Sequence, residues 1–120
     1  MVQESQEENS PPRYGIVFHP LARKDMADIN VGWHESIYDA IEHKLGIAPT
    51  LLGEILKHSK HLLWRAKFSK VRIVYTIVET SREIIVLSVE KRDSVYKLSH
   101  LDRLRRVAEQ IRRASRGGSK

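Results

Sequence analysis

Cysteine is absent from this sequence of 120 residues, which excludes both a disulfide framework and a thiolate zinc site as the means of holding a small fold together. Long hydrophobic runs are also missing, because no segment approaches the stretch of about 18 to 20 apolar residues that a membrane span needs. The chain is long enough for one compact domain with a modest core and too short for two. We therefore expect a single domain that stays in the cytoplasm and has no membrane contact.

Acidic residues are scarce in the second half of the chain. Residues 1–56 carry four Arg or Lys against nine Asp or Glu, whereas residues 57–72 carry six basic residues and no acidic one. Residues 91–120 carry ten basic residues against three acidic ones. Such clustering favours a polyanionic partner, because each neutralised phosphate releases condensed counterions. Nucleic acid and a strongly acidic protein are the leading candidates, and a solvated basic surface is the alternative.

The two ends of the chain are expected to be flexible. Residues 1–12 are polar and acidic and end in two prolines, so they cannot bury enough apolar area to offset the entropy of ordering. Residues 116–120 are rich in glycine and look like a flexible C-terminal end. The single domain is therefore expected to span residues 13–115.

Apolar residues in the first part of this domain predict a strand and a helical hairpin. Residues 14–18 alternate as in a half-buried strand that ends at Pro20. Within residues 20–30 and 33–45, apolar residues then recur at the three- and four-residue spacing of a helix face. A turn or short helix is expected at residues 49–56.

The hydrophobic pattern then changes to a period of two, which predicts strands at residues 62–68, 71–77 and 83–89. In the first of these strands Arg65 and Lys67 alternate with apolar residues. We therefore expect the strand to pack on one side and to present its cations on the other.

The last predicted element is an amphipathic helix over residues 99–115, with arginines on its polar face. Together with the preceding elements it predicts an α+β domain in which a small antiparallel β-sheet carries an N-terminal helical hairpin and a C-terminal helix. The helices are expected mainly on one face of the sheet, which leaves the opposite face available.

Three strings in this order of elements carry a resemblance to a known family. They are YGIVFHPLARKDM at residues 14–26, LWRAKFSKVRIVY at residues 63–75 and VLSVEKRDSVY at residues 86–96. Over residues 13 to 100 the chain resembles the RelE/ParE superfamily of toxin-antitoxin systems, and the third string is similar to the strand, Lys-Arg turn and tyrosine of its RelE branch. The resemblance implies a RelE-like mRNA interferase of a type II system, a ribosome-dependent endoribonuclease that cuts translated mRNA by attack of a ribose 2′-hydroxyl on the adjacent phosphate.

The resemblance also implies roles for individual residues. Arg72 would contact the scissile phosphate, and Arg92 would stabilise the same charge or assist the leaving oxygen, because prepositioned guanidinium groups favour the transition state over the ground state. Tyr96 would orient the attacking hydroxyl or stack on a base. Further contacts to RNA are expected from Arg65, Lys67, Lys70, Lys91 and His61.

The general base is the point at which this sequence departs from the family. Some relatives carry paired lysines on the strand where this chain has Leu63 and Arg65, and arginine is a poor proton acceptor. Lys67 is favoured as the base, and the alternatives are Lys91, His58 and His61.

Other features of the sequence have simpler explanations. Tyr75 and Trp64 alternate with apolar residues, so we interpret both as core residues. His58 and His61 could bind a metal, but no Cys, Asp or Glu lies near them in sequence, so we expect neither a metal nor a cofactor.

The resemblance implies as partners mRNA, the ribosome with its rRNA, and a cognate antitoxin that forms a hetero-oligomer with the toxin; an acidic, partly disordered antitoxin would also fit the basic charge. Two alternatives remain open. The first is a ParE-like toxin that binds DNA gyrase without being an enzyme, and the second is an inactive relative that only binds RNA or an antitoxin.

Overall fold

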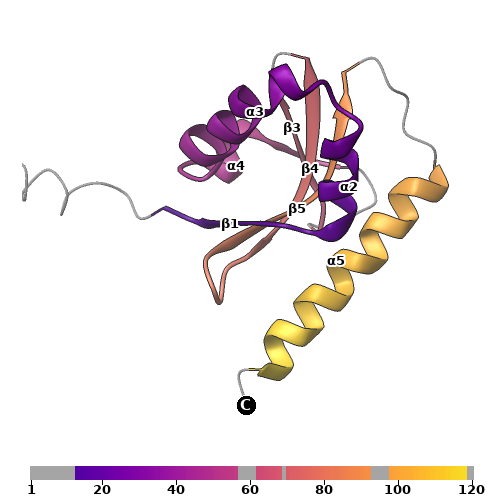
Figure 1. The fold of residues 1–120 in the computed structure, drawn as a ribbon. Helices are drawn as coiled ribbons and strands as arrows, with labels where there is room; N and C mark the ends of the chain where they lie inside the picture. The colour runs from indigo at the N-terminus through magenta and orange to yellow at the C-terminus, as the bar shows by residue number, and fades with distance from the viewer. Residues whose placement is uncertain (1–12, 57–61, 69, 93–97, 119–120) are drawn as a thin grey trace, which may run out of the picture.

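The computed structural model describes residues 13–56, 62–68, 70–92 and 98–118 (Figure 1). In chain order the elements are β1 (Gly15–Phe18), α2 (Pro20–Ala27), the 3-10 turn η1 (Val31–Trp33), α3 (His34–Ala40), the π-helical turn η2 (Ile41–Leu45), α4 (Pro49–Leu52), β2 (Glu54–Ile55), β3 (Trp64–Phe68), β4 (Val71–Val78), β5 (Glu83–Lys91) and α5 (Leu98–Gly118).

The strands form one five-stranded sheet in the order β1-β5-β4-β3-β2. Three of the pairs are antiparallel, as predicted, and form a meander from β2 to β5. β1 instead runs parallel to β5, with Gly15 beside Glu83 and Phe18 beside Val86. The sheet is therefore mixed and mostly antiparallel: the predicted antiparallel pairing holds for three pairs and does not extend to the edge strand β1. A parallel pair needs a long crossover, which the whole helical region and three strands supply here.

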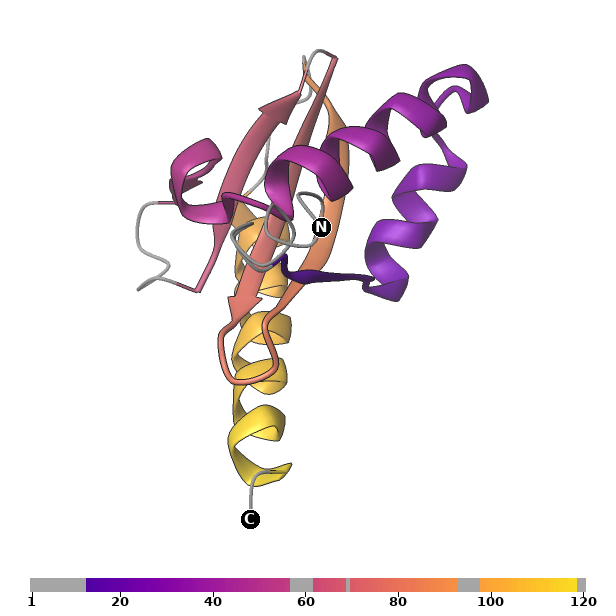
Figure 2. The ribbon, with the colours of Figure 1, turned by 90° about the vertical axis from the view of Figure 1, so that its left-hand side faces the viewer.

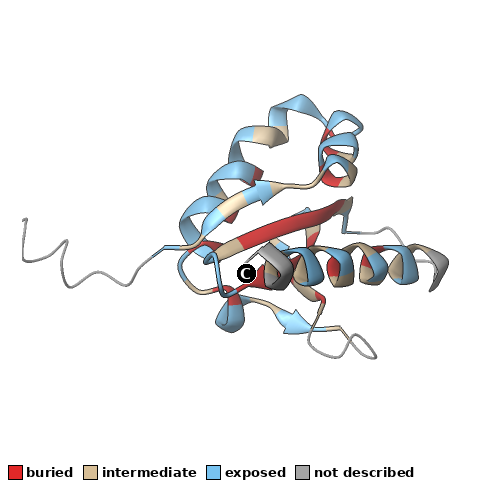
Figure 3. Ribbon diagram, turned by 90° about the horizontal axis from the view of Figure 1, so that it is seen from below, coloured by how far each residue is buried: buried red, intermediate tan, exposed pale blue. Residues whose placement is uncertain are grey.

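Hydrophobic side chains pack on both faces of the sheet. On one face the helical hairpin, made of α2, α3 and η2, covers a core that includes Ile41, Ile73 and Ile84. On the other face Leu104 and Ala108 of α5 are fully buried against residues of β4 and β5. Figure 2 shows the hairpin and α5 on opposite sides of the sheet, and Figure 3 shows the buried strand between them. The expectation that the helices lie mainly on one face was wrong, because the apolar stripe of α5 needs a sheet surface of its own.

The boundaries of two helices also differ from the prediction. The expected helix over residues 33–45 is present as α3 followed directly by the π-helical η2, with η1 before it. The η2 turn ends where the Gly46 amide donates to the Ile41 carbonyl oxygen at 2.8 Å. At the other end of the chain, α5 continues to Gly118 instead of ending near residue 115, so the expected flexible end is helical over residues 116–118. None of the helices in the described ranges is long and apolar enough to cross a membrane.

Tyr75 ties the α4 segment to the sheet. Its side chain is fully buried, and its hydroxyl donates to the Pro49 carbonyl oxygen at 2.6 Å. Burial raises the pKa of Tyr75 far above the range in which it could ionise under ordinary conditions. The half-buried ring of Trp64 stacks on it, with 6.5 Å between the ring centroids. The interpretation of both residues as core residues is confirmed.

His19 connects β1 to the start of α2 and caps this helix. Its Nδ1 atom accepts a hydrogen bond from the Leu21 amide at 3.1 Å, so His19 is the N-cap, with Pro20 in the first turn. Burial lowers the pKa of His19 below its ordinary value of 6.5, and the positive charge of Arg103 lowers it further. A protonated Nδ1 could not accept this bond.

We therefore expect His19 to contribute to the pH dependence of folding. The unfolded chain binds the proton more readily than the folded chain, so the free energy of unfolding should fall as the pH drops from about 7 toward about 5. His19→Asn keeps a capping oxygen but removes the titration, and should flatten this part of the profile in urea denaturation. Asn30→Ala, which removes the side-chain cap of η1 but no titratable group, is the control and should lower stability without changing the slope. An equal flattening in both variants would contradict the assignment.

Candidate functional site

Basic residues gather at the end of the sheet where β3 and β5 finish and β4 begins. Lys67 and Arg72 are direct partners in the β3–β4 ladder, and Val71 is the partner of Lys91 in the β4–β5 ladder. The Arg92 amide donates to the Lys70 carbonyl oxygen at 2.8 Å, which fixes the residue after β5 against the β3–β4 turn. The strand register thus places the predicted residues Lys67, Lys70, Arg72, Lys91 and Arg92 at one end of the sheet. Lys67 and Arg72 share one face there, whereas Lys91, as the partner of Val71, starts from the hairpin face.

Arg72 is the most firmly placed of these residues. It is half-buried and lies between Val71 and Ile73, which are 2% and 0% exposed. Those neighbours point into the core under the hairpin, so the Arg72 side chain points to the opposite face of the sheet. A side chain that starts from a backbone paired on both sides loses little further freedom on binding, so Arg72 can present its guanidinium in a defined orientation.

The surrounding cations are more exposed. Lys67, Lys70, Lys91 and Arg92 all lie on the surface. Exposed lysines and arginines can neutralise the phosphates of a polyanion without a desolvation penalty. The arrangement is therefore one anchored guanidinium among mobile positive charges.

A carboxylate and an imidazole lie on the same face as Arg72. Glu90 is the partner of Arg72 in the β4–β5 ladder, and its Oε1 atom is 2.9 Å from Nε2 of His100 at the start of α5. Burial raises the pKa of Glu90 and Asp25 adds to the rise, whereas His100 and a hydrogen bond from Ser88 oppose it. The carboxylate of Glu90, with its raised pKa, is thus a group on the face of Arg72 that can accept a proton.

The remaining predicted residues do not join this cluster in the described part of the chain. Arg65 lies on the same face of β3 as Lys67, but its Nη2 atom is 3.4 Å from Oε1 of Glu54 on β2. This ion pair holds the guanidinium toward β2. Tyr96, His61 and His58 lie outside the described residues. Among the residues that are described, no three histidine, aspartate or glutamate side chains come together as a metal site.

Sequence reasoning missed Glu90 and His100. Glu90 stands directly before the Lys-Arg turn, so its place beside the cluster could have been found from the strand pattern. His100 could not, because no local pattern shows that the start of α5 crosses the end of β5.

Comparison with solved structures identifies the architecture. The chain matches the RelBE2 toxin-antitoxin complex from Mycobacterium tuberculosis with a TM-score of 0.64 and 20% identity, over 68% of this chain and 94% of the other. It matches the isolated RelE toxin from E. coli with a TM-score of 0.55 and 18% identity, over 78% and 98% of the two chains. This chain has a RelE-like toxin fold.

The RelE-like fold also appears in the match to the intact RelBE toxin-antitoxin complex from E. coli, with a TM-score of 0.55 and 18% identity, over 68% of this chain and 99% of the other. No protein-family model matches the sequence, and no curated protein matches it significantly. The comparison therefore establishes the RelE-like fold, and the roles of the residues at its basic end rest on their own chemistry.

Proposed function

We propose that this protein is the toxin of a toxin-antitoxin system and acts as a ribosome-dependent endoribonuclease on translated mRNA. The observation that carries the proposal is the anchored Arg72, which stands in register with Lys67 and beside the Lys70–Arg92 connection. A nuclease that works without a protein nucleophile needs positive charge at a fixed place, and this end of the RelE-like fold supplies it.

The proposed reaction is an internal transfer at phosphorus. The ribose 2′-oxygen attacks the adjacent phosphorus and loses its proton, the bond from phosphorus to the 5′-oxygen breaks, and that oxygen gains a proton. The products are a 2′,3′-cyclic phosphate and a 5′-hydroxyl. Arg72 and Arg92 would stabilise the negative charge on the equatorial oxygens of the pentavalent intermediate.

The protons would be handled by neighbouring groups. Lys67 would accept the proton of the 2′-hydroxyl, and the Glu90–His100 pair offers a second acceptor on the same face. Tyr96 would orient the attacking hydroxyl or stack on a base. Arg65, Lys70, Lys91 and His61 would bind the RNA backbone.

The proposal includes a protein partner. Two of the matched RelE-like structures are complexes of a toxin with an antitoxin. The second half of this chain is strongly basic, so an acidic and partly disordered antitoxin would find complementary charge here and fold on the surface. The ribosome, through its rRNA, and mRNA would compete for the same cations.

The decisive experiment adds the purified protein to a defined translation reaction and maps the 5′ ends of the message. We expect cuts within translated codons that disappear with Arg92→Ala and in a reaction without ribosomes. An intact message beside inhibited gyrase supercoiling would replace the proposal with the ParE-like alternative. An intact message and uninhibited gyrase, together with retained RNA or antitoxin binding, would indicate an inactive relative.

A further inference from the structure

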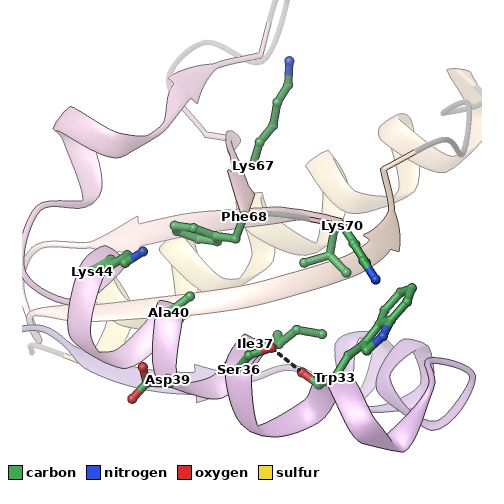
Figure 4. A pocket seen from close by; sticks show the side chains of 10 residues that line it. Trp33, Ser36, Ile37, Asp39, Ala40, Lys44, Lys67, Phe68 and Lys70 are labelled. Carbon is green, nitrogen blue, oxygen red and sulfur yellow. Dashed lines mark hydrogen bonds between the residues drawn. The ribbon is translucent and has the colours of Figure 1, made fainter.

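A hollow of about 560 Å³ lies between α3 and the end of the sheet that carries the basic residues (Figure 4). It opens on the hairpin side, whereas the Arg72 side chain lies on the α5 side. Its size falls in the range of about 300 to 1,000 Å³ that is usual for small-ligand sites. The side chains that matter for its chemistry are Trp33, Asp39, Lys44, Lys67, Phe68 and Lys70.

Two aromatic rings line this hollow. Trp33 and Phe68 are each half-buried, so each ring keeps part of its surface accessible. The backbone of Trp33 is fixed by two hydrogen bonds, from its amide to the Asn30 carbonyl oxygen at 2.9 Å and from the Ser36 hydroxyl to its own carbonyl oxygen at 3.0 Å. Because these bonds fix the backbone of Trp33, a planar ligand can stack on its ring with little loss of conformational entropy in the protein.

Positive charge accompanies the rings. The Lys70 Nζ atom lies 4.8 Å from the centroid of the Trp33 ring. Figure 4 shows Lys44 and Lys70 on opposite sides of Phe68, while Lys67 extends from the rim away from the helices. The one acidic side chain among the lining residues, Asp39, is 69% exposed and lies 3.5 Å from His43. The hollow is thus cationic and aromatic, the combination that binds single-stranded nucleic acid by stacking and phosphate contact.

We propose that this hollow binds a nucleotide of single-stranded RNA that flanks the cleaved phosphate. Its base stacks on Trp33 or Phe68, and its phosphates contact Lys44 and Lys70. Lys67 connects the two sites, because it lines the hollow and is also the ladder partner of Arg72. An RNA strand held at Arg72 can therefore pass the end of β3 and reach the hairpin side. This inference rests on the proposed function in taking RNA as the ligand.

The first test uses the fluorescence of Trp33 in a Trp64→Phe background, where Trp33 is the only tryptophan. The probe is an RNA octamer with 2′-O-methyl groups throughout, which cannot undergo 2′-hydroxyl attack. We expect saturable quenching of Trp33, because a stacked base contacts its ring. Binding of the octamer without any change in this fluorescence would overturn the proposal. A glutamate octamer that gives the same quenching and displaces the RNA would do so too, in favour of an acidic peptide.

The second test needs no change of tryptophan. Lys44→Ala is expected to weaken binding of the octamer about threefold to fivefold and to lower the slope of log affinity against log salt by about 0.7, the loss of one phosphate contact. Lys24→Ala, at an exposed lysine on α2 outside the hollow, is the matched control and should change neither quantity. Equal behaviour of the two variants would refute the site.

A third variant tests stacking directly. Trp33→Ala should weaken octamer binding about tenfold, and Trp33→Phe should restore most of the affinity because it keeps an aromatic face. Melting temperatures measured alongside identify any loss that comes from unfolding. Failure of this inference and failure of the proposed function remain separate. Cuts in the translated message without any effect at Trp33 or Lys44 refute only the hollow, whereas an intact message with quenched Trp33 refutes only the nuclease.

Discussion

Arg72→Ala is expected to slow RNA cleavage by about 10²- to 10³-fold while leaving the protein folded, because it removes a preorganised donor from the charge that develops in the transition state. Arg72 is the second residue of β4 and is held in register with Lys67 on β3 and Glu90 on β5, so the backbone position of its guanidinium is fixed by both neighbouring strands. Arg72→Lys keeps the charge but loses the planar fork that fits two phosphate oxygens, and should recover only part of the rate.

The rate is best measured as a single turnover in the translation reaction, with the enzyme in excess over ribosomes, so that product release does not obscure the chemical step. Arg113→Ala is the control. It removes an exposed arginine that lies thirteen residues after His100 on α5, which is about 20 Å away at the helical rise of about 1.5 Å per residue. The proposed role of Arg72 is untenable if Arg72→Ala and Arg113→Ala cut the message at the same rate. It is also untenable if Arg72→Ala is unfolded at the temperature of the assay, so that unfolding accounts for the loss of rate.

The placement of Arg72 and Lys67 could be predicted from the sequence. Alternation over residues 64–77 assigns each side chain to a face, although it misplaces Leu62, which packs in the same cluster as Leu63 before β3 begins. The short turn between β3 and β4 leaves little freedom in their register. The same reasoning fails across the next hairpin, because an irregularity between Val74 and Tyr75 shifts the β4–β5 register by one residue before Lys91. Local periodicity therefore suffices where consecutive strands are joined by a short turn and no bulge intervenes.

The parts that could not be predicted all depend on contacts between distant segments. An apolar stripe on α5 shows that the helix packs on something, but not that Leu104 meets the face of the sheet opposite the hairpin. The parallel pairing of β1 with β5 and the contact of His100 with Glu90 have the same origin. The approach of Lys70 to Trp33 is a further case, since nothing near either residue in sequence indicates the other.

Gly53→Ala is expected to lower the free energy of unfolding by about 3 kcal/mol, from overpacking together with the loss of one buried hydrogen bond. Gly53 lies between α4 and β2, over the ring of Tyr75. A Cβ atom there would collide with the Tyr75 hydroxyl, and would lie 2.9 Å from its Cζ atom and 3.2 Å from the Arg65 carbonyl oxygen. The ring cannot easily yield, because it is fully buried and bonded to Pro49.

Gly15→Ala makes the same chemical change where a Cβ atom would have room, with Glu83 Cγ at 3.7 Å and the Arg82 carbonyl oxygen at 3.9 Å. Urea denaturation should show little or no loss for it, since such distances are ordinary contacts and alanine also restricts the unfolded chain. The double variant Gly53→Ala with Tyr75→Phe should cost less than the two single variants together, because removing the hydroxyl removes the main collision. Additive losses, or a Gly53→Ala protein as stable as Gly15→Ala, would show that Tyr75 does not hold α4 against the sheet.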